Sequence, residues 1–295
     1  MSRIHDILKK AERDGGMHRT RAIDGDGASA ATAVAEPPAI PTPPLPMHRS
    51  GAAAEATPVN AAPARSTAGP LDSRLVAAHA PQSFAAEQYR ALRTRVNNAE
   101  NGRALRAVLI TSPNKGDGKS LTAANLALTM AQEFQQRVLL VDADLRRPSI
   151  HRLFGITDTP GLSDILMGGA TIDDTLVAMP EHRLTILPSG AVPMHPAELL
   201  GSAAMRRVLD TLRTRFDRIL IDMPPVAPLA DVAIASSMAD GILMIVRAGV
   251  TPRPAIERAL SGLDMSKVLG LVLNDAGDTA AGYGYGYGPD GYTAG

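Results

Sequence analysis

The sequence predicts an α/β fold built on a mainly parallel sheet, and three observations lead to this class. Short runs of Val, Ile and Leu alternate along the chain with longer stretches of helical spacing. The runs are apolar at nearly every position, which is typical of strands buried on both faces. Several runs lead directly into glycine-rich or acidic segments. Ligands bind such sheets at the carboxyl ends of the strands, so we expect the functional site there.

The elements follow from the apolar pattern, with helices expected on both faces of the sheet. Runs of Val, Ile and Leu predict strands over 107–111, 138–142, 184–188, 218–222, 241–246 and 268–273. Stretches of helical spacing between them predict helices over 120–135, 163–168, 196–215, 229–238 and 253–264.

Composition excludes several classes of function. The formal net charge is zero, so no overall basic field indicates a nucleic-acid partner. Cysteine is absent, which excludes disulfides, thiolate metal sites and cysteine nucleophiles. No apolar run approaches the ~18 residues of a spanning helix, and the N-terminus lacks a signal-peptide core. We therefore expect a soluble, cytoplasmic protein.

Two segments precede the α/β region. Apolar residues recur at helical spacing within residues 1–14, which predicts a short amphipathic helix. This helix either packs on its own domain or frays, or it docks on a partner or a membrane surface. Residues 15–80 are rich in Ala and Pro and have no apolar periodicity, so we expect a disordered linker.

A phosphate-binding loop is predicted within AVLITSPNKGDGKSL, where a strand, a glycine-rich turn and a helix start follow one another. Lys119 can reach the β- and γ-phosphates of a nucleotide, and the Ser120 hydroxyl can ligate Mg²⁺. Pro113 stands where the usual spacing has a glycine, so the loop is a variant. The candidate nucleotide-binding residues of the loop are Asn114, Lys115, Gly116, Asp117, Gly118, Lys119, Ser120 and Leu121.

Three carboxylates follow predicted strands. Asp142 and Asp144 come at the end of VLLVDAD, where alternate residues of an extended segment point the same way. Asp222 ends ILID, in the position of a residue that holds Mg²⁺ beside a phosphate loop. We expect ATP and Mg²⁺ as ligands, with Lys119 and the first two carboxylates as catalytic residues. Ser120, Asp144 and Asp222 are the candidate metal ligands, and either Asp142 or Asp144 can be the base.

A charged repeat lies in the segment EQYRALR. Glu87, Arg90 and Arg93 recur every three residues, so they lie near one another on a helix. On the residues alone, a solvated charged face is the favoured interpretation.

The last residues, 277–295, contain tyrosines that are separated mainly by glycine, which predicts a flexible, exposed tail. Such a tail is either a low-complexity adhesive segment or a set of phosphate acceptors. Next to a Mg-ATP site with a candidate base, the second interpretation is favoured. The candidate acceptors are Tyr283, Tyr285, Tyr287 and Tyr292.

Taken together, these motifs resemble those of the bacterial tyrosine kinases (BY-kinases), the polysaccharide-biosynthesis tyrosine autokinases of capsule and exopolysaccharide systems. The resemblance covers about residues 81–295, with the kinase domain over 81–276. It is carried by SPNKGDGKS, VDADLRRP, ILIDMPP, EQYRALR and the tyrosine cluster. The opening SRIHDILKKAE is similar to autokinases of the exosortase-associated subgroup, which is a weaker match.

The resemblance implies an activity and its partners. It implies ATP-dependent autophosphorylation of the tail in trans, within a homo-oligomeric ring whose interface uses Glu87, Arg90 and Arg93. A membrane polysaccharide co-polymerase, here a separate chain, would activate the kinase and hold it peripherally at the inner membrane. A tyrosine phosphatase is the expected counterpart. Asn274 falls where related ATPases place an adenine-contacting asparagine.

The chain also departs from the family pattern, and two other functions stay open. Lys115 stands where the family often has proline. The pair Lys115-Gly116 also resembles partitioning and septum-site ATPases, which dimerise on ATP. Those ATPases carry an extra lysine five residues before the catalytic lysine, and in this chain that position is Asn114. The remaining alternative is a regulatory scaffold in which ring assembly matters more than catalysis.

Overall fold

The computed structural model describes most of the α/β region. The described residues are 69–99, 104–133, 136–226 and 236–276. All of them belong to the second of two compact units of the chain, which begins at Ala61. The predicted N-terminal helix, the predicted linker up to residue 68, most of the predicted helix 229–238 and the tyrosine tail lie outside the described residues.

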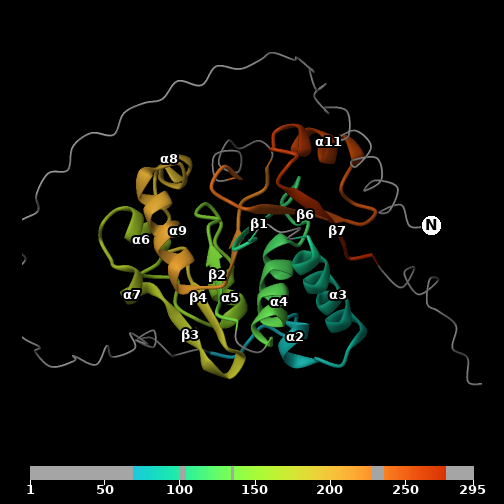
Figure 1. Ribbon diagram of the computed structural model, residues 1–295, viewed down its shortest axis with the longest axis horizontal. Helices are drawn as coiled ribbons and strands as arrows, with labels where there is room; N and C mark the ends of the chain where they lie inside the picture. Colours follow the sequence, from blue (N-terminus) through green and yellow to red (C-terminus); the bar gives the residue numbers. More distant parts are fainter. Residues whose placement is uncertain (1–68, 100–103, 134–135, 227–235, 277–295) are drawn as a thin grey trace, which may run out of the picture. The chain divides into compact units, whose positions relative to one another are not determined.

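A mainly parallel sheet forms the centre of the domain (Figure 1), as the sequence predicted. Its strand order is β3-β4-β2-β5-β1-β6-β7, and only the β3–β4 pair is antiparallel. The strands are β1 Ala107–Thr111, β2 Val138–Asp142, β3 Val177–Met179, β4 Leu184–Leu187, β5 Arg218–Asp222, β6 Gly241–Arg247 and β7 Val268–Asn274.

Helices cover both faces of the sheet because its strands are apolar on both sides. In β1, Leu109 packs into one buried cluster, together with helices α6, α8, α9 and α11. Its neighbours Val108 and Ile110 pack into a second cluster with helices α2, α3, α4 and α5. The bounds are α2 Val76–His79, α3 Phe84–Asn98, α4 Lys119–Ala131, α5 Ile150–Phe154, α6 Leu162–Leu166, α7 Ile172–Thr175, α8 Pro196–Leu200, α9 Ala203–Arg215 and α11 Arg253–Ser261.

Helix α4 is buried nearly all round, because α2 and α3 pack on the side that faces away from the sheet. Asn125 joins these layers. Its amide oxygen accepts a hydrogen bond from the N–H of Ala77 at 3.0 Å, and its amide nitrogen donates to the carbonyl of Arg74 at 3.2 Å. This burial fixes the position of Lys119, which begins the helix.

The structure differs from the sequence prediction in several places. The predicted helix 196–215 is two helices, because the Ser202 side chain caps a new helix by accepting a hydrogen bond from the N–H of Met205. Strand β3 and the short helices α2, α5 and α7 were not predicted, since three to five residues show too little periodicity. A 3₁₀ turn, Pro180–His182, follows β3.

Residues 69–80, which the sequence assigned to the linker, are part of the folded domain. Leu75 is completely buried, and the N–H of Gly69 donates to the carbonyl of Gly155 at 2.7 Å. Composition alone could not place this boundary, because the burial comes from contacts with α4 and α5.

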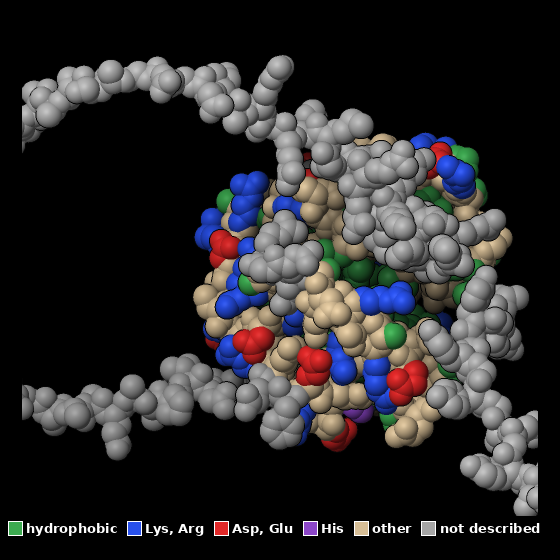
Figure 2. Space-filling view, turned by 45° about the vertical axis from the view of Figure 1, so that its right-hand side comes forward, with side chains coloured by type: hydrophobic (Ala, Val, Ile, Leu, Met, Phe, Trp, Pro, Cys, Tyr) green, Lys and Arg blue, Asp and Glu red, His purple; other side chains and the backbone are tan. Residues whose placement is uncertain are grey.

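Positive and negative side chains both occur on the face shown in Figure 2, in keeping with the zero formal charge. Among the helices of the described part of the chain, none has the length and apolar character needed to cross a membrane.

Packing of α4 between sheet and outer helices gives a stability prediction. Leu126→Ala removes a completely buried side chain, so we expect the free energy of unfolding to fall by about 2–5 kcal/mol. Leu273→Ala makes the same chemical change at a side chain that is 51% exposed, and it should cost less than about 1 kcal/mol. Urea unfolding measures both, and equal losses would contradict the burial of α4.

Candidate active site

The phosphate loop joins the end of β1 to the start of α4. Gly116 and Gly118 have φ angles of +89° and +94°, a region that favours glycine. Within the loop the Ser112 hydroxyl donates to the carbonyl of Asn114 at 2.8 Å. Pro113, in the position of the absent glycine, is not among the residues with positive φ, so the loop needs no glycine there. The two left-handed positions of the loop are both filled by glycine.

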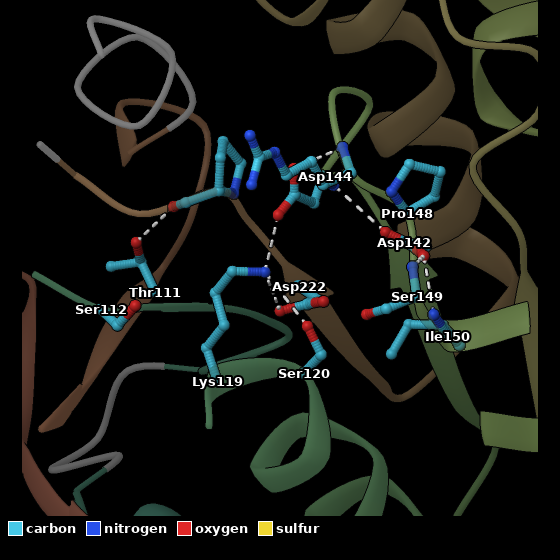
Figure 3. A network of polar contacts seen from close by, with 12 residues as sticks. Thr111, Ser112, Lys119, Ser120, Asp142, Asp144, Pro148, Ser149, Ile150 and Asp222 are labelled. Atoms are coloured by element: carbon cyan, nitrogen blue, oxygen red, sulfur yellow. Dashed lines mark hydrogen bonds and ion pairs between the residues drawn. The ribbon is translucent and has the colours of Figure 1, made fainter. Parts of the chain in front are cut away.

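Two of the strand-end carboxylates, Asp144 and Asp222, meet Lys119 at the head of this loop (Figure 3). The ammonium of Lys119 lies 2.8 Å from Asp144 Oδ2 and 3.4 Å from Asp222 Oδ1, and 3.1 Å from the Ser120 hydroxyl. Strands β2, β5 and β1 are neighbours, and Asp142 pairs with Asp222 in the β2–β5 register. The topology therefore brings together the residues that the sequence selected.

Asp142 is held by backbone N–H groups and does not bond to Lys119. Its Oδ2 accepts hydrogen bonds from Ser149 and Ile150, both at 2.9 Å, and its Oδ1 accepts one from Asp144 at 3.2 Å. The carboxylate thus satisfies the first N–H groups of α5. Burial and the nearby charge of Asp222 raise the pKa of Asp142 to about 7.

Asp144 and Asp222 contact the lysine directly, and each has further constraints. Asp144 Oδ1 accepts the N–H of Arg147 at 3.1 Å. Asp222 is completely buried, and burial raises its pKa against the opposing charge of Lys119. Burial lowers the pKa of Lys119, but the charges of Asp222 and Asp144 outweigh this effect and leave it raised. The lysine therefore stays charged.

The donor set fits a magnesium ion. Hydroxyl and carboxylate oxygens are the ligands that Mg²⁺ prefers. Asp222 Oδ2 is buried and takes no hydrogen bond from the described residues. In this part of the chain no group of three or more His, Cys, Asp or Glu side chains is arranged to hold a metal ion. Ser120, Asp144 and Asp222 would therefore hold the ion together with the phosphates of a nucleotide.

The other predicted residues of the loop have different surroundings. The side chain of Lys115 is exposed, whereas Leu121 packs partly buried against the core. Asn274 lies against the loop, where its amide nitrogen donates to the carbonyl of Asp117 at 3.0 Å. The Asp117 side chain is buried within the loop and bonds to Thr251. Thr251 was not predicted from the sequence, although its position just after β6, a neighbour of β1, is a usable signal.

The charged repeat lies on α3, outside this site, and its three residues make different contacts. Glu87 and Arg90 form an ion pair with each other, and Arg90 also bonds to the carbonyl of Pro81. Arg93 instead holds α3 onto α4, with an ion pair to Glu133 at 3.1 Å and a hydrogen bond to the carbonyl of Thr129 at 3.0 Å.

The four candidate acceptor tyrosines of the tail lie outside the described residues. The remaining tyrosine, Tyr89, is partly buried on α3. Burial raises its pKa, and the phenol bonds to the side chains of Thr122 and Asn125 on α4. Its hydroxyl is therefore used inside the domain.

The fold and the loop define a P-loop NTPase of the ParA type. The family model described as "ParA: NUBPL iron-transfer P-loop NTPase" matches residues 104–276.

Relatives identify the branch within this class. The chain is 36% identical over 206 residues to tyrosine-protein kinase YwqD of Bacillus subtilis, covering 69% of this chain and 86% of that protein. It is 35% identical to tyrosine-protein kinase CpsD of Streptococcus agalactiae, covering 67% and 86%.

Solved structures agree with these relatives. The kinase domain of Escherichia coli tyrosine kinase ETK superposes with a TM-score of 0.66 at 29% identity, covering 72% of this chain and 84% of that one. The chain also matches tyrosine-protein kinase Wzc of Salmonella typhimurium at 34% identity, over 73% of this chain but 30% of that protein. The chain belongs to the bacterial tyrosine kinase family.

The raised pKa of Asp142 predicts a pH dependence of stability. The folded protein keeps this proton up to about pH 7, whereas the unfolded chain releases it near the ordinary value of 3.8. Between these values the folded state binds more protons, so the free energy of unfolding falls as pH rises. Each pKa unit corresponds to about 1.4 kcal/mol, so the fall is at most about 4 kcal/mol. Asp142→Asn should lack this part of the slope.

Denaturant unfolding without nucleotide or Mg²⁺, at several pH values across this window, measures the effect. Asp174→Asn is the matched control, because hydrogen bonds from Thr171 lower the pKa of that exposed carboxyl. Asp174→Asn should change the free energy of unfolding by a similar amount at every pH in the window. A slope in Asp142→Asn equal to that of the wild type would contradict the prediction.

Proposed function

We propose that this tyrosine kinase uses ATP and Mg²⁺ to phosphorylate its own tail in trans, and that it thereby regulates polysaccharide polymerisation and export. The acceptors are Tyr283, Tyr285, Tyr287 and Tyr292. The family to which the chain belongs supports the reaction, and the resemblance to capsule and exopolysaccharide autokinases supports its setting.

The observation that carries the proposal is one ammonium among three buried carboxylates. Lys119 bonds to Asp144 and Asp222, and Asp142 adds to their field. The cluster has more negative than positive charge, so a nucleotide needs an accompanying cation to bind there. The lysine must also exchange a carboxylate for the phosphates. Both requirements support a Mg-ATP site whose charge balance changes when the nucleotide binds.

The proposed step is a transfer of the γ-phosphoryl group to a phenol. The tyrosine oxygen forms a bond to the γ-phosphorus, and the bond from that phosphorus to the bridging oxygen breaks, which releases ADP. The phenol proton goes to one of two strand-end carboxylates, Asp142 or Asp144. Because Asp142 interacts with the charge of Asp222, proton uptake by Asp142 depends on both of these groups. A pKa of about 7 suits a proton acceptor near neutral pH.

The activating partner in this proposal is a separate membrane co-polymerase. The match to Wzc covers 30% of that protein, so the longer relative has sequence beyond the kinase region. We infer that a separate chain supplies the corresponding function here. It would place the kinase at the cytoplasmic side of the inner membrane, with a tyrosine phosphatase to reverse the modification.

Removal of the central cation tests the reaction. In Lys119→Met no ammonium can hold the phosphates, so we expect phosphate transfer to the tail to fall about 100- to 1,000-fold. The measurement is incubation of the full chain and its activator with Mg-ATP, followed by mapping of phosphotyrosine. Lys267→Met makes the same chemical change away from the site, where Lys267 bonds to the carbonyls of Ser236 and Ser237. It should keep full transfer.

Two results would contradict the proposal. One is the absence of phosphate from the tail of the wild type, and the other is unchanged transfer in Lys119→Met. ATP-dependent binding to DNA or lipid vesicles without phosphotyrosine would instead favour the partitioning-type switch.

The different contacts of Arg93 and Glu87 in the charged repeat lead to a second prediction, on ring assembly. Arg93→Ala loses an intramolecular ion pair and a hydrogen bond, so the free energy of unfolding should fall by about 1–2 kcal/mol. Glu87→Ala changes a side chain that is 59% exposed, and stability should change by less than about 0.5 kcal/mol. If Glu87 serves the ring, this variant should nevertheless form smaller oligomers.

Light scattering after size-exclusion chromatography, combined with urea unfolding, separates these effects. Glu257→Ala is a control for the loss of an exposed, paired glutamate on another helix, α11. Wild-type oligomer size in Glu87→Ala would argue against its place in the interface.

A further inference from the structure

Asp117 presents an electrostatic problem, because it is a carboxylate within a loop that binds anions. It lies between the two glycines of the phosphate loop. Two like charges 4 Å apart repel by about 4 kcal/mol at an effective dielectric constant of 20. A carboxylate that faced the nucleotide phosphates would therefore weaken their binding. The side chain must be directed elsewhere, and its own hydrogen-bonding needs must be met.

The structure meets both needs. Asp117 is only 2% exposed. Its Oδ2 accepts a hydrogen bond from the N–H of Asn114 at 2.8 Å, across the turn of the loop. Its Oδ1 accepts one from the hydroxyl of Thr251 at 2.8 Å. The carboxylate thus spans the loop on one side and reaches the turn after β6 on the other.

The hydroxyl of Thr251 has a fixed direction. It accepts the N–H of Arg247 at 2.9 Å, and the N–H of Thr251 in turn donates to the carbonyl of Arg247 at 3.0 Å. Because a carboxylate oxygen only accepts hydrogen bonds, the hydrogen of this hydroxyl is directed to Asp117. Thr251 is therefore a donor held on a rigid turn, outside the phosphate loop itself.

A second brace comes from the end of β7. Asn274 donates to the carbonyl of Asp117, and its amide nitrogen lies so close to Gly118 that a Cβ there would be 2.0 Å away. The carbonyl of Asn274 also accepts the N–H of Ala248, in the same turn as Thr251. The backbone and side chain of Asp117 are thus both held by the β6–α11 turn and the end of β7.

We propose that Asp117 and Thr251 are positioning residues, which hold the phosphate loop in its anion-binding shape and keep the Asp117 charge away from the phosphates. This inference rests on the proposed use of the loop for a nucleotide. The pair sets the affinity for the nucleotide, whereas Lys119 and the strand-end carboxylates serve the transfer. Loss of the Thr251 hydroxyl frees one carboxylate oxygen to turn towards the phosphates.

Equilibrium binding of a fluorescent ADP in the presence of Mg²⁺ tests the pair directly. Thr251→Val keeps the shape of the side chain but removes its donor, and we expect the affinity to fall about 10- to 100-fold. Thr251→Ser restores the hydroxyl and should restore most of the affinity. When Asp117→Asn is already present, adding Thr251→Val should lower the ADP affinity much less than it does in the wild-type background. The reason is that the two residues act through one hydrogen bond.

Kinetics and stability separate this role from a merely structural one. The KM for ATP should rise in Thr251→Val by a factor similar to the loss of affinity, while kcat at saturating ATP stays within about twofold. Thr214→Val is the control, since it removes the same group from an exposed threonine on α9 whose hydroxyl bonds to the carbonyl of Thr211. It should leave binding unchanged.

The outcomes distinguish the two proposals. Unchanged ADP affinity in Thr251→Val overturns the positioning role and leaves the proposed kinase reaction intact. An equal loss of affinity in Thr251→Ser and Thr251→Val also overturns it, because the hydroxyl would then not be the determinant. A wild-type protein that does not bind ADP with Mg²⁺ overturns the proposed function, and the positioning role with it.

Discussion

The ion-pair cluster around Lys119 is the interaction on which the rest of the site depends. Burying three carboxylates in one domain is costly unless each is compensated. Backbone N–H groups compensate Asp142, whose pKa of about 7 also lets it keep a proton. Lys119 compensates Asp144 and Asp222. A single lysine thus balances two neighbouring strand ends, and any ligand that draws this lysine away must bring positive charge of its own.

The sheet makes this cluster possible. Strands β2 and β5 are neighbours in register, so Asp142 and Asp222 emerge side by side, and β1 next to β5 delivers the phosphate loop. Helix α4 is held between the sheet and the outer helices, which leaves its first residue little freedom. Packing therefore preorganises the site together with its polar contacts. The energetic cost of the buried charges is met by the aliphatic core on both faces.

Several polar residues near the site support the phosphate loop and do not face the ligand. Asp117 is turned into the loop, and its partners come from the turn after β6 and the end of β7. A similar division occurs on α3, where Arg93 serves the packing of α4 while Glu87 faces outwards. Within one short motif, neighbouring residues thus have different tasks, because a helix turns each of them towards different surroundings.

The sequence by itself determined the parallel α/β class, the bounds of most strands and the set of residues around Lys119. These features depend on local patterns: apolar runs, glycines at left-handed positions and acids at strand ends. Tertiary structure alone decided that Leu75 is core, that 196–215 is two helices and that Thr251 supports the phosphate loop. Thr251 and Asp117 are 134 positions apart, and only the strand order places them together. Such contacts leave no periodic trace in the chain, because they depend on which strands become neighbours.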